Sequence, residues 1–281
     1  MKLIGLILAA VMAPRYVDAA AARARPRIVI PRFAISTLSI VVLVLVWYGA
    51  TNFGFVSPDY LPSPQSLASR FWVLLRDGYQ GESLFGQINA SLSRTLGGFV
   101  IGGTLGVAVG LAAGYSRFLA AMISPIMSFI RPIPPIAFIP MVVLYFGLGE
   151  TGKVVLITVT AFNYAVVNAQ AGAAGTPMAY RRAAATLGLS KWQEFWKVIF
   201  PAALPSIFTG LRVALALSWA VVVAAELVGA QTGLGFMINN AALLFDIPTV
   251  FIGIALIGLI GLILNTVIEV AESRIVHWRG R

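Results

Sequence analysis

Apolar residues in this chain gather into long runs, and short polar connections separate one run from the next. A helix that crosses a lipid bilayer needs about 20 consecutive, mostly apolar residues. Because several runs reach this length, the pattern predicts an all-α integral membrane protein with about six transmembrane helices. The expected spans are residues 33–53, 91–115, 119–147, 154–172, 211–230 and 250–270.

The composition supports a membrane protein and excludes several kinds of metal and catalytic site. Hydrophobic residues make up 59% of the chain and charged residues only 11%, whereas a soluble domain carries roughly 25% charged residues. Cysteine is absent, which excludes disulfides and thiolate metal sites. The one histidine, His277, argues against a histidine-based metal site or catalytic triad. We therefore expect no cofactor or metal site, and no catalysis that depends on cysteine or histidine.

The net charge of +10 has two interpretations, a nucleic-acid-binding protein or a membrane protein that retains Lys and Arg on its cytoplasmic side. The second is favoured because the charges alternate between successive connections, as the positive-inside rule requires. Residues 180–201 and both chain ends are therefore expected in the cytoplasm, and nucleic acid is not expected as a partner. The basic segments carry Arg23, Arg25, Arg27, Arg32, Arg117, Arg181, Arg182, Lys191, Lys197, Arg274, Arg279 and Arg281, and the acidic or neutral ones carry Asp59, Asp77, Glu82, Glu150 and Asp246 against Arg70, Arg76 and Lys153.

The first twenty residues resemble a short signal peptide, because Lys2 precedes an apolar run at 3–12 and an alanine-rich end. An arginine-rich segment follows directly, and cleavage with export would place it outside the cell. We therefore favour an uncleaved cytoplasmic tail, or a chain that starts at Met12.

The connection at 61–78 contains signals for a helix of its own. Ser63 can cap this helix, Pro64 suits its first position, and Gly78 can close it. Its apolar side suits a helix that lies at the membrane surface. We expect a structural role for it.

The second span carries a glycine at every fourth position. In a helix these glycines form one smooth face, which lets another backbone approach closely. The pattern predicts a tightly packed helix in the core of a bundle or of a dimer. The glycines are Gly98, Gly102, Gly106, Gly110 and Gly114.

Residues 129–140 of the third span contain an arginine and four prolines, Arg131, Pro132, Pro134, Pro135 and Pro140. Each proline removes a helix donor and clashes with the preceding turn, so the pattern predicts a broken helix. Such backbone is tolerated at membrane depth only where protein or a water-filled cavity satisfies it. Because an arginine facing lipid is costly, we expect Arg131 to face the interior. It either lines a pathway for anionic solutes or holds freed carbonyls and acidic groups, and the residues do not distinguish the two.

Two further polar residues lie within predicted spans. Asn163 in the fourth span either forms a hydrogen bond to a neighbouring helix or lines a pathway. Glu226 in the fifth span is an intramembrane carboxylate and hence a candidate pathway residue, and it equally suits a buried partner for an arginine.

Residues 147–154 match the phosphate-binding pattern G-x-x-x-x-G-K-[ST] except at Val154. Val154 has no hydroxyl for Mg²⁺, and no soluble βαβ context surrounds the loop. The charge pattern also places it outside the cell. We therefore expect a tight turn between spans and no ATP binding.

The basic, water-facing stretch 180–201 is expected to form two short helices. Gly188 is the natural left-handed end of the first, a Ser190–Gln193 capping box starts the second, and Pro201 ends it. Small residues in the first helix, flanked by Arg181 and Arg182, suit insertion into a groove of a cytoplasmic partner. The alternative is a simple linker at the membrane boundary. The small residues are Ala183, Ala184 and Ala185.

This stretch resembles the cytoplasmic EAA loop of ABC importer permeases, E-A-A-x₃-G-x₉-I-x-L-P. Arg182 stands where the motif has its glutamate, and the resemblance extends from about residue 89 to the chain end. R-P-I-P-P-I-A-F-I-P, F-G-L-G-E-T-G-K, T-G-L-R and A-A-E-L are similar to the branch that imports nitrate, taurine and alkanesulfonates. The matching positions of the loop are Ala183, Ala184, Gly188 and Pro201, with conservative changes at Val198 and Phe200.

The resemblance implies a type I importer permease (MetI-like) fold in the bacterial inner membrane, with a cytoplasmic coupling helix. It implies a homodimer with two cytoplasmic ABC ATPase subunits, a periplasmic solute-binding protein and membrane lipid as partners. The implied coupling residues are Arg182, Ala183, Ala184, Gly188 and Pro201, and the candidate pathway residues are Arg131, Asn163 and Glu226.

On this basis the predicted organisation is a cytoplasmic tail at 1–32, a first span with a periplasmic amphipathic helix at 33–88, and a core permease domain at 89–272. The coupling loop lies at 180–201 within that domain, and a second cytoplasmic tail covers 273–281. The alternative function is a stand-alone channel or secondary transporter. Inverted repeats with paired broken helices would indicate the latter, whereas this sequence shows one strongly broken span. A membrane-embedded enzyme would need clustered His, Asp or Glu at membrane depth. This chain offers one clear mid-bilayer acid, Glu226, so we expect a transport subunit and not an enzyme.

Overall fold

The computed structural model describes residues 32–278, and side-chain environments from residue 37. The expectations for residues 1–20, for most of the 1–32 tail and for Arg279 and Arg281 lie outside these residues. The described chain is helical apart from its connections and one isolated bridge, between Tyr79 and Glu82. Two compact units divide it at Phe53.

The first unit contains α2 (Arg32–Asn52), whose bounds agree with the predicted span 33–53. Most described side chains of α2 are exposed, and Leu43 has an exposed fraction of 67%. An apolar surface of this kind suits lipid or protein contact. The described apolar part, Thr37–Asn52, is shorter than the helices that meet the length for a membrane crossing by themselves.

The second unit contains the remaining predicted spans. Within the described residues, four helices are long and apolar enough to cross a membrane, and one bent pair adds a fifth candidate. This agrees with the expected all-α membrane fold. The four are α4 (Leu84–Tyr115), α7 (Glu150–Ala174), the continuous helix Lys191–Gly229 and α12 (Ile247–Ile275).

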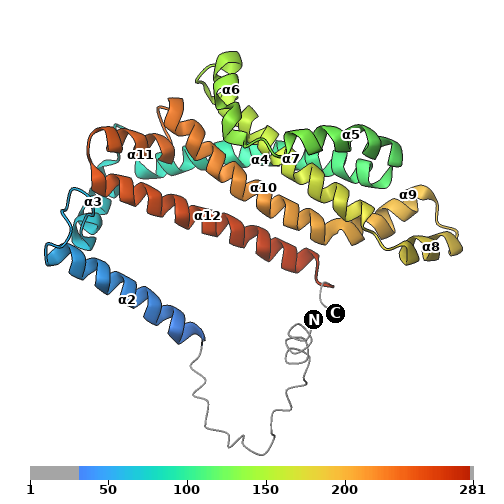
Figure 1. The fold of residues 1–281 in the computed structure, drawn as a ribbon, viewed down its shortest axis with the longest axis horizontal. Coiled ribbons are helices and arrows are strands. Elements are labelled where there is room, and N and C mark those ends of the chain that lie inside the picture. The colour runs from blue at the N-terminus through green and yellow to red at the C-terminus, as the bar shows by residue number, and fades with distance from the viewer. Residues whose placement is uncertain (1–31, 279–281) are drawn as a thin grey trace, which may run out of the picture. The chain divides into compact units, whose positions relative to one another are not determined.

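The glycine face of α4 packs against α7, which confirms the predicted close approach. Both helices are labelled in Figure 1. A Cβ added at Gly106 would lie 2.7 Å from both the Ala165 Cβ and the Phe162 carbonyl oxygen. At Gly102 it would collide with the carbonyl of Thr158. The contacts advance along both helices in the same direction, so α4 and α7 are parallel.

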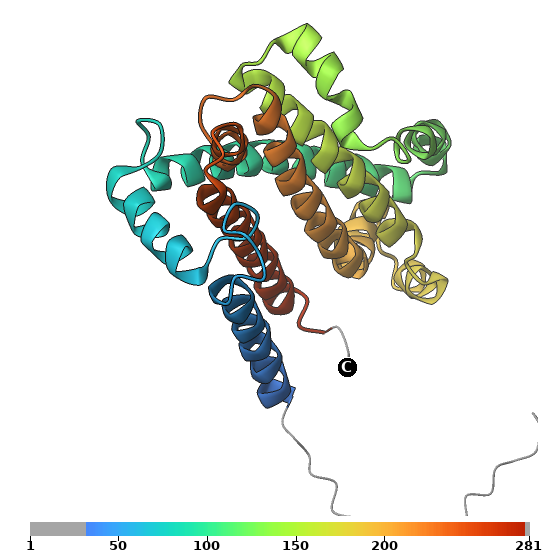
Figure 2. The same cartoon turned by 60° about the vertical axis from the view of Figure 1, so that its left-hand side comes forward.

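The helix α10 (Phe200–Gly229) packs on α7 in the opposite direction (Figure 2). Ser206 Oγ donates a hydrogen bond to the Asn168 carbonyl oxygen at 3.0 Å. The indole of Trp219 on α10 then donates to the Ile257 carbonyl oxygen on α12 at 3.0 Å. These bonds tie successive helices together at membrane depth, where unpaired polar groups are costly.

The predicted break in the third span is confirmed. α5 (Arg117–Ile130) is followed by the short helices η1 (Pro135–Phe138) and α6 (Ile139–Phe146), and the pair is bent by 87°. Because α4 and α7 are parallel, the chain must return across the bundle between them. The bent pair makes that return.

α3 (Pro64–Asp77) forms as the sequence predicts, since Ser63 Oγ accepts a hydrogen bond from the Ser66 amide at 3.2 Å. Gly78 closes it with a φ of 74°. An ion pair between Arg70 and Asp246 links α3 to the start of α12.

The stretch 180–201 differs from the prediction at its end. α8 (Met178–Thr186), the left-handed Gly188 and the capping box of α9 (Lys191–Glu194) are present as expected. Pro201, however, does not end the second helix. A π-helical turn, η2 (Phe195–Ile199), precedes α10, and such a wide turn accommodates a residue without an amide donor, so the helix runs on.

One helix was not predicted. α11 (Leu234–Leu243) lies in the connection before α12 and packs against α10 and α12. Its sequence, LGFMINNAAL, is too short for a span. An apolar run of this length between two turns is the signal that could have indicated it.

We expect Gly106→Ala to lower the free energy of unfolding by about 1–3 kcal/mol, because the added methyl group overpacks the α4–α7 contact. Gly97 is the matched control, since a Cβ there meets nothing within 4 Å. Gly97→Ala should raise the stability of the helix by up to about 1 kcal/mol. The thermal unfolding midpoint of each variant in detergent measures both effects, and equal midpoints would contradict the close approach.

Candidate functional site

The α8–Gly188–α9 turn presents a small, basic surface. Arg182, Ala183 and Leu187 are exposed, and Leu187 has an exposed fraction of 78%. Ala184 is buried at 3%, so its methyl group packs inward and away from any partner. Of the predicted coupling residues, Arg182, Ala183 and Gly188 therefore lie on the surface, whereas Ala184 and the half-buried Pro201 support it.

Contacts on both sides hold this turn in place. Arg181 Nε on α8 donates to Glu194 Oε1 on α9 at 2.8 Å. The Leu189 amide donates to the Ala184 carbonyl oxygen at 3.1 Å, which closes the turn. The Arg181 guanidinium also lies over the Tyr115 ring at the end of α4, 5.9 Å from its centre. The turn is therefore attached to the helical core.

A second polar cluster, which we call the Glu226 cluster, lies in the core. Glu226 has an exposed fraction of 1%. One carboxylate oxygen accepts from Arg94 Nη1 at 2.7 Å, and the other accepts from Ser91 Oγ at 2.8 Å and from the Gly235 amide at 2.9 Å. Each oxygen is therefore paired, as a buried carboxylate requires.

The connection before α11 folds around this carboxylate. Gly233 has a φ of 121°, and a Cβ there would collide with the Glu226 carboxylate. The Gly233 amide donates to Gln87 Oε1 at 2.7 Å, and the Leu234 amide donates to Ser91 Oγ at 2.8 Å. Side chains of α4 thus satisfy the free amides at the start of α11, where a negative charge is also favourable.

Arg94 extends the Glu226 cluster to α7. Its Nη1 also donates to the Thr232 carbonyl oxygen at 2.7 Å, and its Nη2 donates to Glu150 Oε1 at 2.8 Å. Lys153 Nζ reaches the same Glu150 oxygen at 3.0 Å. One arginine therefore connects α4, α7, α10 and the connection before α11.

Arg94 was not among the site residues predicted from the sequence. It lies inside the predicted span 91–115, and an arginine within a span is the signal that could have identified it. The contacts of Glu226 match the second alternative given for it, a buried partner for an arginine. A pathway role for Glu226 stays a prediction.

The other two candidate pathway residues lie apart from the Glu226 cluster. Contrary to the sequence prediction, Arg131 does not face the interior of the single chain but is exposed at the bend between α5 and η1. It forms no side-chain hydrogen bond or ion pair with the described residues. Asn163 on α7 is 6% exposed, and its Oδ1 has no hydrogen-bond partner within the described chain. No hydrogen bond joins Arg131, Asn163 and Glu226 in the part of the chain that the structure describes.

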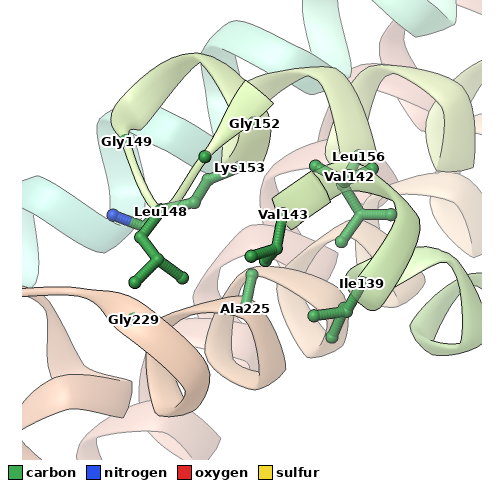
Figure 3. A pocket seen from close by; sticks show the side chains of 11 residues that line it. Ile139, Val142, Val143, Leu148, Gly149, Gly152, Lys153, Leu156, Ala225 and Gly229 are labelled. Carbon is green, nitrogen blue, oxygen red and sulfur yellow. The ribbon is translucent and has the colours of Figure 1, made fainter. Parts of the chain in front are cut away.

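The segment that resembles a phosphate-binding loop forms a turn and the start of α7. Gly147 adopts a φ of 70°, and Lys153 lies beside a cavity of about 20 Å³ lined mainly by aliphatic side chains (Figure 3). That volume is close to the space of one water molecule and far too small for a nucleotide. The geometry therefore agrees with the expected tight turn. No group of His, Cys, Asp and Glu suited to a metal ion occurs among the described residues.

We expect Arg94→Met to cost about 3–5 kcal/mol of stability, because it leaves Glu226 buried without a cation. Glu226→Gln should cost less, about 1–3 kcal/mol, since Arg94 keeps its bonds to Glu150. The double variant should cost less than the sum by about 0.5–3 kcal/mol. Unfolding midpoints in detergent measure all three changes.

Arg70→Met is the control for this cycle. Arg70 and Asp246 form an ion pair whose side chains are 32% and 23% exposed, and pairs of this kind contribute about 0–1 kcal/mol. Strict additivity of the two substitutions in the Glu226 cluster would show that Arg94 and Glu226 do not stabilise one another.

Relatives of known name cover most of this chain. It is 36% identical over 248 residues to the taurine transport system permease protein TauC of Escherichia coli. The match covers 88% of this chain and 90% of that protein. The chain is 34% identical over 256 residues to the nitrate import permease protein NrtB of Synechocystis. That match covers 89% of this chain and 90% of that protein.

The fold also has solved counterparts. An inward-facing crystal structure of the MetNI methionine ABC transporter superposes with a TM-score of 0.59, at 22% identity, over 76% of this chain and 99% of that one. Likeness at this identity shows the fold alone, and it confirms the expected type I permease architecture. Residues 102–277 match the family described as binding-protein-dependent transport system inner membrane component. This chain belongs to that family, and it is a multi-pass transport subunit of the inner membrane and not an enzyme.

Proposed function

We propose that this chain is the permease subunit of an ATP-binding cassette importer and forms the membrane pathway for a small anionic or zwitterionic solute. The observation that carries the proposal is the exposed basic turn made by α8, Gly188 and α9, which is attached to the core and free on its outer face. A small helix with exposed Arg182 and Ala183 suits a groove in a cytoplasmic partner. Family membership favours this function over a stand-alone channel or secondary transporter.

The partners that this function requires are two ABC ATPase subunits, a second copy of the chain and a periplasmic solute-binding protein. The turn docks on the ATPase in the cytoplasm, and both chain ends lie on that same side. Hydrolysis occurs in the ATPase, and this chain converts the movement of the docked turn into a change of access.

A single continuous helix supports such a transmission. Lys191–Gly229 begins at the turn and ends beside the Glu226 cluster, and at about 1.5 Å per residue it is roughly 58 Å long. The ion pair between Arg181 and Glu194 fastens α8 to the start of this helix. A displacement of α8 is therefore passed along one continuous helix to Arg94, Glu150 and α11.

The solute class is inferred from the relatives and from Arg131. The relatives are named for the transport of taurine and nitrate, which are a zwitterionic sulfonate and an oxyanion. Arg131 stands at the bend of α5 and η1 with its guanidinium unpaired by other described residues. A cation at a broken helix favours a negatively charged group in the pathway. Asn163, with its unpaired amide oxygen, is a second candidate for solute contact.

We expect Ala183→Asp to reduce solute uptake at least about tenfold while the protein still inserts and dimerises, because a charge on the exposed face disrupts docking on the ATPase. Ala183 suits this test better than Ala184, whose burial would confound uncoupling with loss of stability. The measurement is ATP-driven uptake by the full importer in proteoliposomes, with ATP hydrolysis followed in parallel.

The control for this experiment is Ala68→Asp, which places the same charge on the exposed surface of α3. Ala68→Asp should leave uptake unchanged. Normal uptake by Ala183→Asp, or uptake that persists without ATP while ion gradients are held, would contradict the proposed coupling.

A second expectation concerns Arg131. Arg131→Gln should lower the uptake of an anionic solute about tenfold or more, and Arg131→Lys should retain a larger share because it keeps the charge. ATPase assembly, measured by co-purification, should not change in either variant. If both substitutions reduce uptake equally and assembly falls with it, Arg131 has a structural role.

A further inference from the structure

An apolar groove lies between the second half of α4 and the helix that begins at α9. Its volume is about 790 Å³. Val107 and Leu111 line it from α4, and Phe195, Phe200 and Leu204 line it from the opposite helix. The groove shares no lining residue with the Glu226 cluster or with α8, and it meets the proposed docking turn only at Lys191 and Trp192 of α9.

The groove is as long as one leaflet of a bilayer. It starts where Gly103 faces Leu211, near the middle of α4, and ends where the Tyr115 hydroxyl approaches the Lys191 carbonyl oxygen at 3.4 Å. At about 1.5 Å per residue, the stretch from Gly103 to Tyr115 is roughly 18 Å long. Half of the hydrocarbon core of a membrane is about 15 Å thick.

The two ends of the groove differ in chemistry. Lys191, which is exposed, is the one charged side chain among the described residues that line the groove, and it lies at the end near the α8–α9 turn. Trp192 and Trp196 flank this end with exposed fractions of 70% and 45%, and their rings pack edge to face at 5.5 Å. Tryptophan concentrates at the level of lipid headgroups. The charged end is therefore the end at the membrane boundary, and the apolar end reaches toward the middle of the bilayer.

We propose that this groove binds an anionic phospholipid, with an acyl chain along α4 and its phosphate at Lys191. The chemistry of the groove matches this molecule from end to end, with an apolar channel of one leaflet's length, aromatic rings at the interface and a cation at the headgroup. Basic residues at the membrane surface attract anionic lipid in the same way. A neighbouring apolar helix is the rival occupant, but such a helix gives no reason for a cation at the interface end.

The lipid site is independent of the proposed transport function. Lys191 follows Ser190, the cap residue of α9, so a bound headgroup lies at the first residue of α9. The lipid would stabilise the start of the long helix whether or not an ATPase docks there. Failure of lipid binding and failure of coupling are therefore separate results.

The test compares phosphatidylglycerol with phosphatidylcholine of identical acyl chains, added to the full-length purified protein in detergent. Native mass spectrometry counts the lipids that stay bound. We expect phosphatidylglycerol to be retained over phosphatidylcholine, and Lys191→Glu to reduce that retention about tenfold. Lys197→Glu is the matched control, because Lys197 is exposed on the same helix outside the groove and should leave retention unchanged.

A second pair of variants tests the apolar channel. Ala108 is exposed and lines the groove, so Ala108→Trp fills the channel without disturbing the core and should lower the retention of phosphatidylglycerol by a similar factor. Leu105→Trp adds the same ring to the same helix outside the groove, where Leu105 is 54% exposed, and should have no effect.

Three results would overturn the proposal. Equal retention of both lipids, unchanged by Lys191→Glu, would show that the groove does not recognise an anionic headgroup. Unchanged lipid retention with a changed oligomeric state in Ala108→Trp would identify the groove as an interface between copies. A disulfide between Leu43→Cys and Ala108→Cys, in a chain that has no other cysteine, would show that α2 covers the groove.

Discussion

The backbone contact between α4 and α7 is the constraint on which the other features depend. In lipid, apolar helices gain little from burial against one another, so close packing must supply the attraction, and glycine permits it. The contact holds the two helices parallel and in one register, with Gly98 against Ile157. One turn earlier on α4, Arg94 forms an ion pair with Glu150 at the start of α7. The parallel arrangement also requires the bent return through α5 and α6.

The buried charges follow from this geometry. An arginine or a glutamate alone at membrane depth is expensive, and the cost falls when each finds partners. Arg94 and Glu226 come from helices that both pack on α7, and the connection before α11 supplies the remaining bonds through its amides. The cluster thus joins elements that are far apart in sequence at one end of the bundle. The cluster therefore holds these helix ends together at fixed positions.

Hydropathy and local signals predicted a large part of this fold. Five of the six predicted spans, counting the bent pair as the third, are long and apolar enough to cross a membrane within the described residues. The glycine face, the break in the third span, α3 and the capping box at Ser190 are also present, and each is encoded within a few neighbouring residues. The sequence did not reveal that Arg94 pairs with Glu226, because 131 residues lie between them and no local pattern links two distant charges. It also misplaced the end of the helix at Pro201, since proline alone does not show whether a wider turn absorbs its missing donor. The inward direction of Ala184 required the packing of α8 to be known.

The π-helical turn at Phe195–Ile199 has a consequence for the direction in which the α8–α9 turn points. A π turn holds one more residue than an α-helical turn, and one residue corresponds to about 100° of rotation around the helix axis. The α8–α9 turn, which directly precedes Phe195, is therefore rotated by roughly that angle relative to a helix without the extra residue. Deleting one residue here would aim Arg182 and Ala183 at a different side of the bundle, with every transmembrane contact of α10 unchanged. The direction of the α8–α9 turn is thus set by the length of a single helical turn.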